Sequence, residues 1–188
     1  VKAIKIGLIG HHKTASAIHS VLIQHPHIPV ILDPVLAAGG GASVSNQQLI
    51  DCIVEQLLPC TTILTPNSEE ARTLSQQEDL SLCGQTLIDK GCDYVLITGT
   101  HEQSTSVNNQ LFQSNDKTET FSWDRLAEEY HGSGCTLASA IAALIAQGLD
   151  PFTAISEAQD YTWNALAAAY HPGKGQHLPN RLFWMENS

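Results

Sequence analysis

Basic residues are scarce in this chain of 188 residues: 9 Lys and Arg stand against 19 Asp and Glu, and the formal net charge is −10. The nine are scattered along the chain, with no run among them. A nucleic-acid surface needs clustered Lys and Arg, so the composition argues against one. An anionic ligand would have to be bound locally, by backbone amides, a metal ion or one or two basic groups.

Long apolar runs and paired cysteines are missing as well. No stretch approaches the roughly 20 apolar residues that are needed to cross a bilayer. The first ten residues contain two Lys and no long apolar run, unlike a signal peptide. The five cysteines form an odd set without a Cys-x-x-Cys pair, which is typical of reduced thiols. We therefore expect a cytoplasmic protein with no membrane segment.

What the chain does contain is an alternation of short apolar runs and helical segments. With 43% hydrophobic residues, it predicts one α/β domain over residues 1–188. A polar stretch, 107–121, predicts a β-hairpin with its turn at Asn108-Asn109 or at Asn115-Asp116. The expected strands are 3–9, 30–32, 61–64 and 94–97, and the expected helices are 14–24, 46–58, 68–74, 80–90, 136–147 and 151–170.

Continuously apolar strands that alternate with helices indicate a mostly parallel sheet covered on both faces. Open sheets of this kind bind ligands at the carboxyl ends of their strands. Polar or glycine-rich turns follow each expected strand, and they would gather distant side chains along one rim of the sheet. These turns are Gly10-His11-His12, Asp33-Pro34-Val35, Thr65-Pro66-Asn67 and Thr98-Gly99-Thr100-His101.

The segment Gly132-Ser133-Gly134-Cys135 leads directly into an apolar helix. Its glycines let the backbone approach a ligand, and the first amides of a helix form an anion site suited to a phosphoryl group. A helix start is also expected to lower the pKa of the Cys135 thiol, which could then accept the proton of a substrate hydroxyl. Taken alone, the segment fits a glycine-rich cap with a structural cysteine slightly better.

Three oxygen-bearing side chains favour the phosphate interpretation. Asp33 ends a buried strand on the expected rim, and Asn67 and Glu70 lie at the mouth of the next strand. Such ligands hold Mg²⁺ mainly through water. Asn67 and Glu70 also have the spacing of a capping box, and both interpretations can hold together. Asp124-Arg125, before the glycine loop, looks like part of a solvated loop, although Arg125 could approach phosphate.

Four motifs follow one another along the chain. They are Lys5-Ile6-Gly7-Leu8, Asp33-Pro34-Val35-Leu36, Leu64-Thr65-Pro66-Asn67 with Glu70-Ala71, and residues 131–142 beginning His131-Gly132-Ser133-Gly134-Cys135-Thr136. In combination these motifs resemble the hydroxymethylpyrimidine and phosphomethylpyrimidine kinases of thiamine biosynthesis, within the ribokinase-like superfamily. The resemblance covers nearly the whole chain, and the last motif is the most specific. Other ribokinase-like enzymes usually carry Asp where this sequence has Cys135.

The resemblance implies a role for each matching position and a three-layer α/β/α ribokinase-like fold. Cys135 matches the catalytic position, with Gly132, Ser133 and Gly134 as the anion hole. Leu8, Val35 and Cys135 are expected to contact the pyrimidine. The expected nucleotide-binding residues are Asp33, Asn67, Glu70, Thr98 and Gly99, with Asp33 and Glu70 also near Mg²⁺.

Several departures from the family pattern stand out. Thr98 occupies a position where the family usually has a Lys, and Gly39-Gly40-Gly41 lacks the Lys often found in that loop. Leu8 replaces a common Met. The sequence corresponds to about the last two thirds of such a kinase, so we expect the fold without the first βαβ block and lid.

The expected function is ATP- and Mg²⁺-dependent phosphorylation of hydroxymethylpyrimidine and of its monophosphate to the diphosphate. Pyridoxal kinase is the alternative within enzymes. The missing block and Thr98 favour a third hypothesis, a truncated, non-catalytic domain that binds a nucleotide or pyrimidine. The resemblance also leaves a homodimer open.

Overall fold

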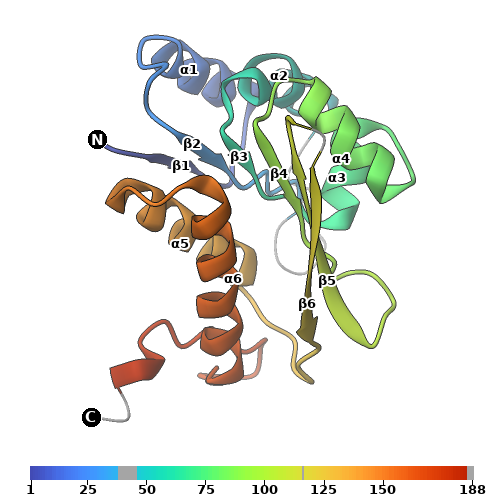
Figure 1. Cartoon of the computed structure of the whole chain (residues 1–188), viewed down its shortest axis with the longest axis vertical. Helices are drawn as coiled ribbons and strands as arrows, with labels where there is room; N and C mark the ends of the chain where they lie inside the picture. The colour runs from blue at the N-terminus through green and yellow to red at the C-terminus, as the bar shows by residue number, and fades with distance from the viewer. Residues whose placement is uncertain (38–45, 116, 186–188) are drawn as a thin grey trace.

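A computed structural model describes residues 1–37, 46–115 and 117–185, which form six strands and six α-helices (Figure 1). The glycines at 39–41 and Asp116 lie outside these ranges. In chain order the elements are β1 (Ile4–Ile6), α1 (His12–Leu22), β2 (Val30–Leu32), α2 (Gln47–Cys52), β3 (Ile63–Leu64), α3 (Ser68–Ser75), α4 (Leu80–Asp89), β4 (Tyr94–Ile97), β5 (Ser106–Gln113), β6 (Thr118–Asp124), α5 (Ser133–Gln147) and α6 (Pro151–Ala167).

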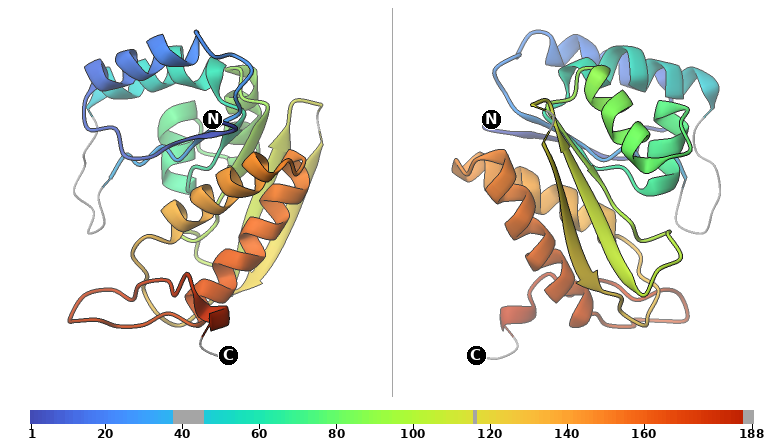
Figure 2. Two further views of the ribbon diagram at one scale, coloured as in Figure 1. Left: turned by 90° about the vertical axis from the view of Figure 1, so that its left-hand side faces the viewer. Right: turned by 45° about the vertical axis from the view of Figure 1, so that its right-hand side comes forward.

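The strands form one sheet in the order β1-β2-β3-β4-β5-β6. Strands β1 to β4 are parallel, and the β5–β6 hairpin extends the sheet with antiparallel pairs. Right-handed crossovers between successive neighbours place every connecting helix on the same face. Helices α1 to α4 accordingly cover one face, and α5 and α6 cover the other (Figures 1 and 2). The prediction of a mostly parallel, three-layer α/β fold is confirmed.

The strands alternate between two hydrophobic clusters, one on each face of the sheet. Leu32 and Leu64 belong to the cluster beneath α1 to α4. Ile31, Ile63 and Leu96 point the other way, into the cluster beneath α5 and α6. Because successive side chains of a strand point to opposite faces, a sheet buried on both sides needs continuously apolar strands, and this is the pattern that predicted it.

Most predicted helix boundaries are confirmed by their capping residues. Asn46 accepts a hydrogen bond from the Leu49 amide, 2.9 Å away, at the start of α2. Pro151 opens α6. Gly91 and Gly148 end α4 and α5 in left-handed conformations, with φ of +109° and +100°, which glycine adopts without strain.

Several details of the prediction are wrong. The helices expected over 14–24, 136–147 and 151–170 are His12–Leu22, Ser133–Gln147 and Pro151–Ala167. The helix expected over 46–58 is α only to Cys52, and continues as a π-helical turn (Ile53–Leu57) and a 3₁₀ turn (Leu58–Cys60). Pro59, which has no amide to continue the helix, accounts for the end of the helix but not for the π-helical turn that begins at Ile53. The strands expected at 3–9 and 61–64 are shorter, Ile4–Ile6 and Ile63–Leu64. Asn108 and Asn109 lie inside β5, so the hairpin does not turn there.

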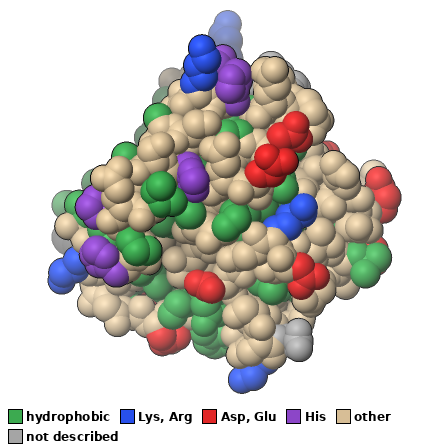
Figure 3. All heavy atoms as spheres, turned by 90° about the horizontal axis from the view of Figure 1, so that it is seen from above, with side chains coloured by type: hydrophobic (Ala, Val, Ile, Leu, Met, Phe, Trp, Pro, Cys, Tyr) green, Lys and Arg blue, Asp and Glu red, His purple; other side chains and the backbone are tan. Residues whose placement is uncertain are grey.

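The charges on the surface are distributed as expected from a composition with few Lys and Arg. On the face shown in Figure 3, Lys and Arg side chains form no broad patch, and acidic, histidine and apolar side chains are interspersed with them. Among the described residues, no helix is both long enough and apolar enough to span a membrane.

Candidate active site

The carboxyl ends of β1, β2 and β3 meet at one edge of the sheet, as predicted. The Asp33 amide donates to the carbonyl of Ile6, and the Thr65 amide donates to the carbonyl of Leu32, both at 2.9 Å. These bonds extend the parallel pairing one residue beyond the strands. They fix the Asp33 carboxylate at this edge, where it is only 5% exposed.

Lys5 balances the charge of Asp33. Its Nζ lies 3.1 Å from Asp33 Oδ2, and the Lys5 side chain is 23% exposed. A carboxylate this buried needs a charged or hydrogen-bonding partner, and Lys5 provides both. Lys5 is the central residue of β1, between Ile4 and Ile6.

The start of α5 lies beside Asp33. Gly132 is the N-cap with φ of +86°, and no side chain caps the helix. Each of the other five α-helices has a side-chain cap. A Cβ on Gly134 would lie 3.9 Å from Asp33 Oδ1, so the glycine loop and the Asp33 turn are adjacent. The first amides of α5 therefore remain available to a ligand.

Cys135 is the exposed thiol of the chain, and the structure places it against Asp33. Partial burial raises the pKa of Cys135, and so do the Asp33 charge and a hydrogen bond from the thiol to Asp33. Lys5 and Arg181 oppose this rise. The prediction that the helix start lowers this pKa is wrong. Partial burial of the thiol, together with the neighbouring Asp33 carboxylate, outweighs the expected stabilisation of the thiolate.

Asn67 and Glu70 form the capping box that their spacing predicts. Asn67 Oδ1 accepts from the Glu70 amide, and Glu70 Oε2 accepts from the Asn67 amide, both at 2.9 Å. Glu70 Oε1 also accepts from the Leu36 amide at 3.3 Å. Glu70 thus joins the start of α3 to the turn after β2, which carries Asp33.

Burial raises the pKa of Glu70 from 4.5 to about 7, and the nearby Asp33 and Glu69 charges act in the same direction. Its hydrogen bonds from Asn67 and Leu36 only partly offset the rise. The site therefore holds two acidic side chains, Asp33 and Glu70, and the charge of Asp33 disfavours that of Glu70.

This pKa predicts how the stability of the chain depends on pH in the presence of a metal chelator. Folded protein binds more protons than unfolded protein between pH 4.5 and about 7, so the Glu70 contribution to the free energy of unfolding falls as pH rises through that range. At about 1.4 kcal/mol per pKa unit, the loss is about 3 kcal/mol. Urea unfolding at pH 5 and pH 8 measures it.

Glu70→Gln should reduce this pH dependence because the group no longer titrates. Glu157→Gln is the control, since Glu157 is an exposed carboxylate in α6 that does not contribute to the Glu70 shift. Equal pH dependence in the parent and in Glu70→Gln would contradict the prediction.

Thr98 and Gly99 lie at the end of β4, next to the start of α3. The Thr98 carbonyl accepts from the Ser68 amide at 3.2 Å, and the Gly99 amide donates to Asn109 Oδ1 at 3.0 Å. A Cβ on Gly99 would meet the carbonyl oxygen of Asn108. Close backbone packing is thus a sufficient reason for the glycine. A role in nucleotide binding remains a prediction for both residues.

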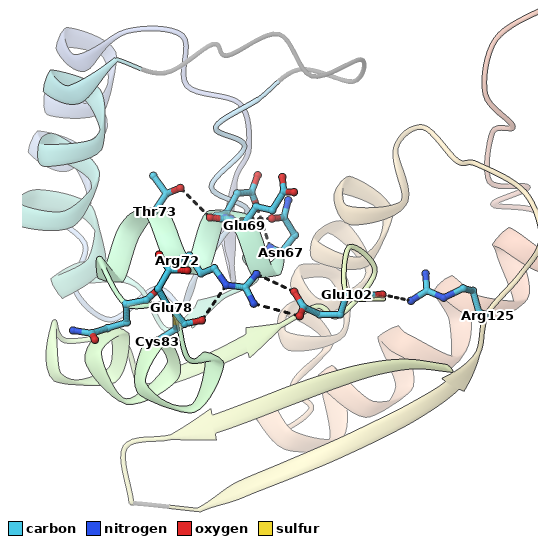
Figure 4. A network of polar contacts seen from close by, with 10 residues as sticks. Asn67, Glu69, Arg72, Thr73, Glu78, Cys83, Glu102 and Arg125 are labelled. Carbon is cyan, nitrogen blue, oxygen red and sulfur yellow. Dashed lines mark hydrogen bonds and ion pairs between the residues drawn. The ribbon is translucent and has the colours of Figure 1, made fainter. Parts of the chain in front are cut away.

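Two arginines hold the loop that follows Gly99 (Figure 4). Arg72 Nη1 and Nη2 pair with the Glu102 carboxylate at 2.9 and 3.3 Å. Arg125 donates from Nε, Nη1 and Nη2 to the carbonyls of Ser104, Thr100 and Glu102, each at 2.9 Å. The interpretation of Arg125 as a phosphate-binding cation is not supported, since its guanidinium is already engaged by the loop.

The two other expected pyrimidine contacts lie on separate parts of the rim. Val35 is half-buried in the Asp33 turn. Leu8 is 59% exposed and lines an open hollow of about 390 Å³ between β1 and α1, which Asp33 and Cys135 do not line. A pyrimidine that touches Leu8 and Cys135 together would lie across the end of β1.

Sequence comparison identifies the enzyme class. The profile of the phosphomethylpyrimidine kinase family matches residues 1–180. The chain belongs to the phosphomethylpyrimidine kinase family. It is therefore a phosphotransferase.

Individual relatives agree with this family. A hydroxymethylpyrimidine/phosphomethylpyrimidine kinase of Staphylococcus aureus (strain Mu50 / ATCC 700699) is 28% identical over 98% of this kinase and 69% of the relative. A bifunctional thiamine biosynthesis protein of Geobacter sulfurreducens is 32% identical over the whole chain and 39% of its own length. Among solved structures, a Bacillus subtilis pyridoxal kinase in complex with ADP superposes with a TM-score of 0.90, at 23% identity, over 98% of this chain and 72% of that one. This last similarity shows the fold alone.

Two cations of this kinase site were not predicted from the sequence as functional residues, Lys5 and Arg181. A charged residue between two isoleucines of a short strand was a usable signal for Lys5. Arg181 follows the last helix and has no such signal. Its contacts with the glycine loop depend on how the segment after α6 folds back along that helix.

Proposed function

We propose that this kinase transfers the γ-phosphoryl group of ATP to hydroxymethylpyrimidine and to its monophosphate, and so makes the diphosphate used in thiamine biosynthesis. The observation that carries the proposal is the meeting of Cys135 with Asp33 at the uncapped start of α5. The names of relatives that match nearly all of the chain support the choice of substrate.

In the proposed reaction, a substrate oxygen forms a bond to the γ-phosphorus while the bond to the leaving ADP oxygen breaks. With hydroxymethylpyrimidine this oxygen is the hydroxyl, whose proton passes to the Cys135 thiolate. With the monophosphate it is a phosphate oxygen, which needs no such proton transfer. Burial and Asp33 raise the pKa of the Cys135 thiol, so it must release its proton to solvent before it can accept the substrate proton. The amides at the start of α5 stabilise charge on the transferring phosphoryl oxygens.

Asp33 and Glu70 fit a Mg²⁺ ion that is held mainly through water. They are two carboxyl groups whose mutual repulsion a cation would relieve. Within the described residues, no cluster of three or more His, Cys, Asp and Glu side chains could enclose a metal directly. Bound Mg²⁺ would supply neutralisation of nucleotide phosphate charge. Asn67, Thr98 and Gly99 complete the proposed nucleotide side of the site.

The test is a comparison of substrates with the full chain. ATP consumption and product mass are measured with hydroxymethylpyrimidine, its monophosphate and pyridoxal, with and without Mg²⁺. We expect Mg²⁺-dependent transfer with kcat/KM at least tenfold higher for a pyrimidine than for pyridoxal. A preference for pyridoxal would favour the pyridoxal kinase alternative. Pyrimidine binding by calorimetry without ATP consumption would favour a non-catalytic domain.

The proposal includes the cellular location and the oligomeric state of the enzyme. A cytoplasmic location fits the unpaired thiols Cys52, Cys60, Cys83, Cys92 and Cys135. Assembly as a homodimer is a further element of the proposal, and light scattering on the purified chain tests it.

A further inference from the structure

The segment that follows α6 folds back along that helix toward the start of α5. The Asn180 amide donates to the carbonyl of Ala165 at 2.8 Å. The Tyr161 hydroxyl donates to the carbonyl of Arg181 at 3.1 Å. Both contacts hold the backbone at Arg181 against α6. The Arg181 side chain lies on the side of this segment that faces the start of α5.

The Arg181 side chain lies on the glycine loop. Its Nε donates to Thr136 Oγ1 at 3.0 Å, and the same hydroxyl donates to the Gly132 carbonyl at 2.8 Å. A Cβ on Gly132 would lie 3.3 Å from Arg181 Nη2. The guanidinium therefore sits directly over the residues that begin α5, and its charge is near enough to Cys135 to oppose the rise in pKa that burial of the thiol causes.

The charge of Arg181 is not balanced by any carboxylate in the part of the chain that the structure describes. Lys5 pairs with Asp33, and Arg72 pairs with Glu102. The three guanidinium nitrogens of Arg125 are bound by carbonyls. Within the described ranges, Arg181 uses only Nε, so Nη1 and Nη2 have no acceptor. In a chain of net charge −10, an exposed and unbalanced guanidinium beside a phosphate-type loop is unusual.

We propose that Arg181 binds the phosphoryl oxygens held at the start of α5. A guanidinium presents two parallel donors that match two oxygens of one phosphate. The Thr136 contact fixes Nε, and this leaves the two Nη groups for the ligand. That this phosphate is the γ-phosphoryl group of ATP rests on the proposed function.

Inorganic pyrophosphate is the probe, because its binding does not require phosphate transfer. Its affinity is measured by titration calorimetry for the parent chain, Arg181→Gln, Arg181→Lys and Lys174→Gln. Lys174→Gln is the matched control, since it removes one exposed positive charge from the same segment. We expect at least a tenfold loss of affinity in Arg181→Gln, a smaller loss in Arg181→Lys and less than a twofold change in Lys174→Gln.

A measurement on the parent chain avoids dependence on how the variants fold. Phenylglyoxal modifies arginine, and mass spectrometry follows Arg181, with Arg72 and Arg125 as internal references. We expect pyrophosphate to protect Arg181 at least fivefold more than either reference. A purely structural contact between Arg181 and Thr136 would give no such selective protection.

The inference is overturned if pyrophosphate does not bind the parent chain, if Arg181→Gln binds it as tightly as the parent, if Lys174→Gln loses as much affinity, or if Arg181 is not protected. Selective protection without any ATP consumption would leave this inference standing while the proposed function fails. The two can therefore be told apart.

Discussion

A Cys135→Ala variant should keep its fold and lose phosphate transfer by about 10²–10⁴-fold, the usual contribution of a proton-accepting side chain. The thiol is exposed at the first turn of α5, so its removal leaves no cavity in either hydrophobic cluster. The loss should appear mainly in kcat, because the proton moves during the reaction and not during substrate binding. Steady-state kinetics under saturating ATP measure it.

Cys60→Ala is the matched control for this variant. Cys60 is a half-buried thiol that lies in the 3₁₀ turn before β3. Its replacement should change kcat less than twofold. Cys135→Ser should fall between the parent and Cys135→Ala, since a hydroxyl can still donate to Asp33 but ionises far less readily. Turnover of Cys135→Ala at the parent rate would remove the thiol from the mechanism.

Asp33→Asn should have two effects of opposite sign. We expect kcat/KM for phosphate transfer to fall at least 100-fold, because the proposed Mg²⁺ site loses a carboxylate. Reaction of Cys135 with iodoacetamide should become faster at neutral pH. The pKa of Cys135 is raised by burial, by the Asp33 charge and by its hydrogen bond to Asp33, and the variant removes the Asp33 charge. Intact-mass spectrometry against pH follows the alkylation.

The same variant leaves Lys5 half-buried without its charged partner. Loss of a charge-assisted bond costs about 1–3 kcal/mol of stability, so urea unfolding accompanies the kinetic assays. Asp89→Asn is the control, since Asp89 is an exposed carboxylate at the end of α4. Unchanged or slower alkylation in Asp33→Asn would show that Asp33 does not control the thiol.

The strand and helix pattern could be predicted because its causes are local. Val30-Ile31-Leu32 is apolar on both faces because both faces are buried, and Asn46, Gly91 and Gly148 mark helix ends by their own chemistry. The capping box of Asn67 and Glu70 follows from spacing alone. The π-helical turn could not be predicted in the same way, because it depends on the packing of that segment.

Within the site, the sequence predicted which residues take part better than it predicted their pKa shifts and their charged partners. Cys135 and Asp33 each belong to a recognisable segment, but only the fold shows that the thiol is partly buried beside this carboxylate. The predicted direction of the Cys135 pKa shift is wrong for this reason. Arg181 could not be found from the sequence, because its contact with Thr136 depends on the return of the last segment along α6.

The two faces of the sheet are completed by different stretches of the chain, and this bears on how the protein forms during synthesis. The cluster under α1 to α4 is built entirely from residues Ile6 to Phe112. The opposite cluster requires α5 and α6. Because emerging chains form contacts from the N-terminal side first, the Asp33 turn can be in place well before Cys135 leaves the ribosome. The reactive thiol thus reaches its carboxylate partner only as the second face is covered. A nascent chain that stalls before α5 leaves Ile31, Ile63 and Leu96 uncovered and cannot assemble its phosphate site.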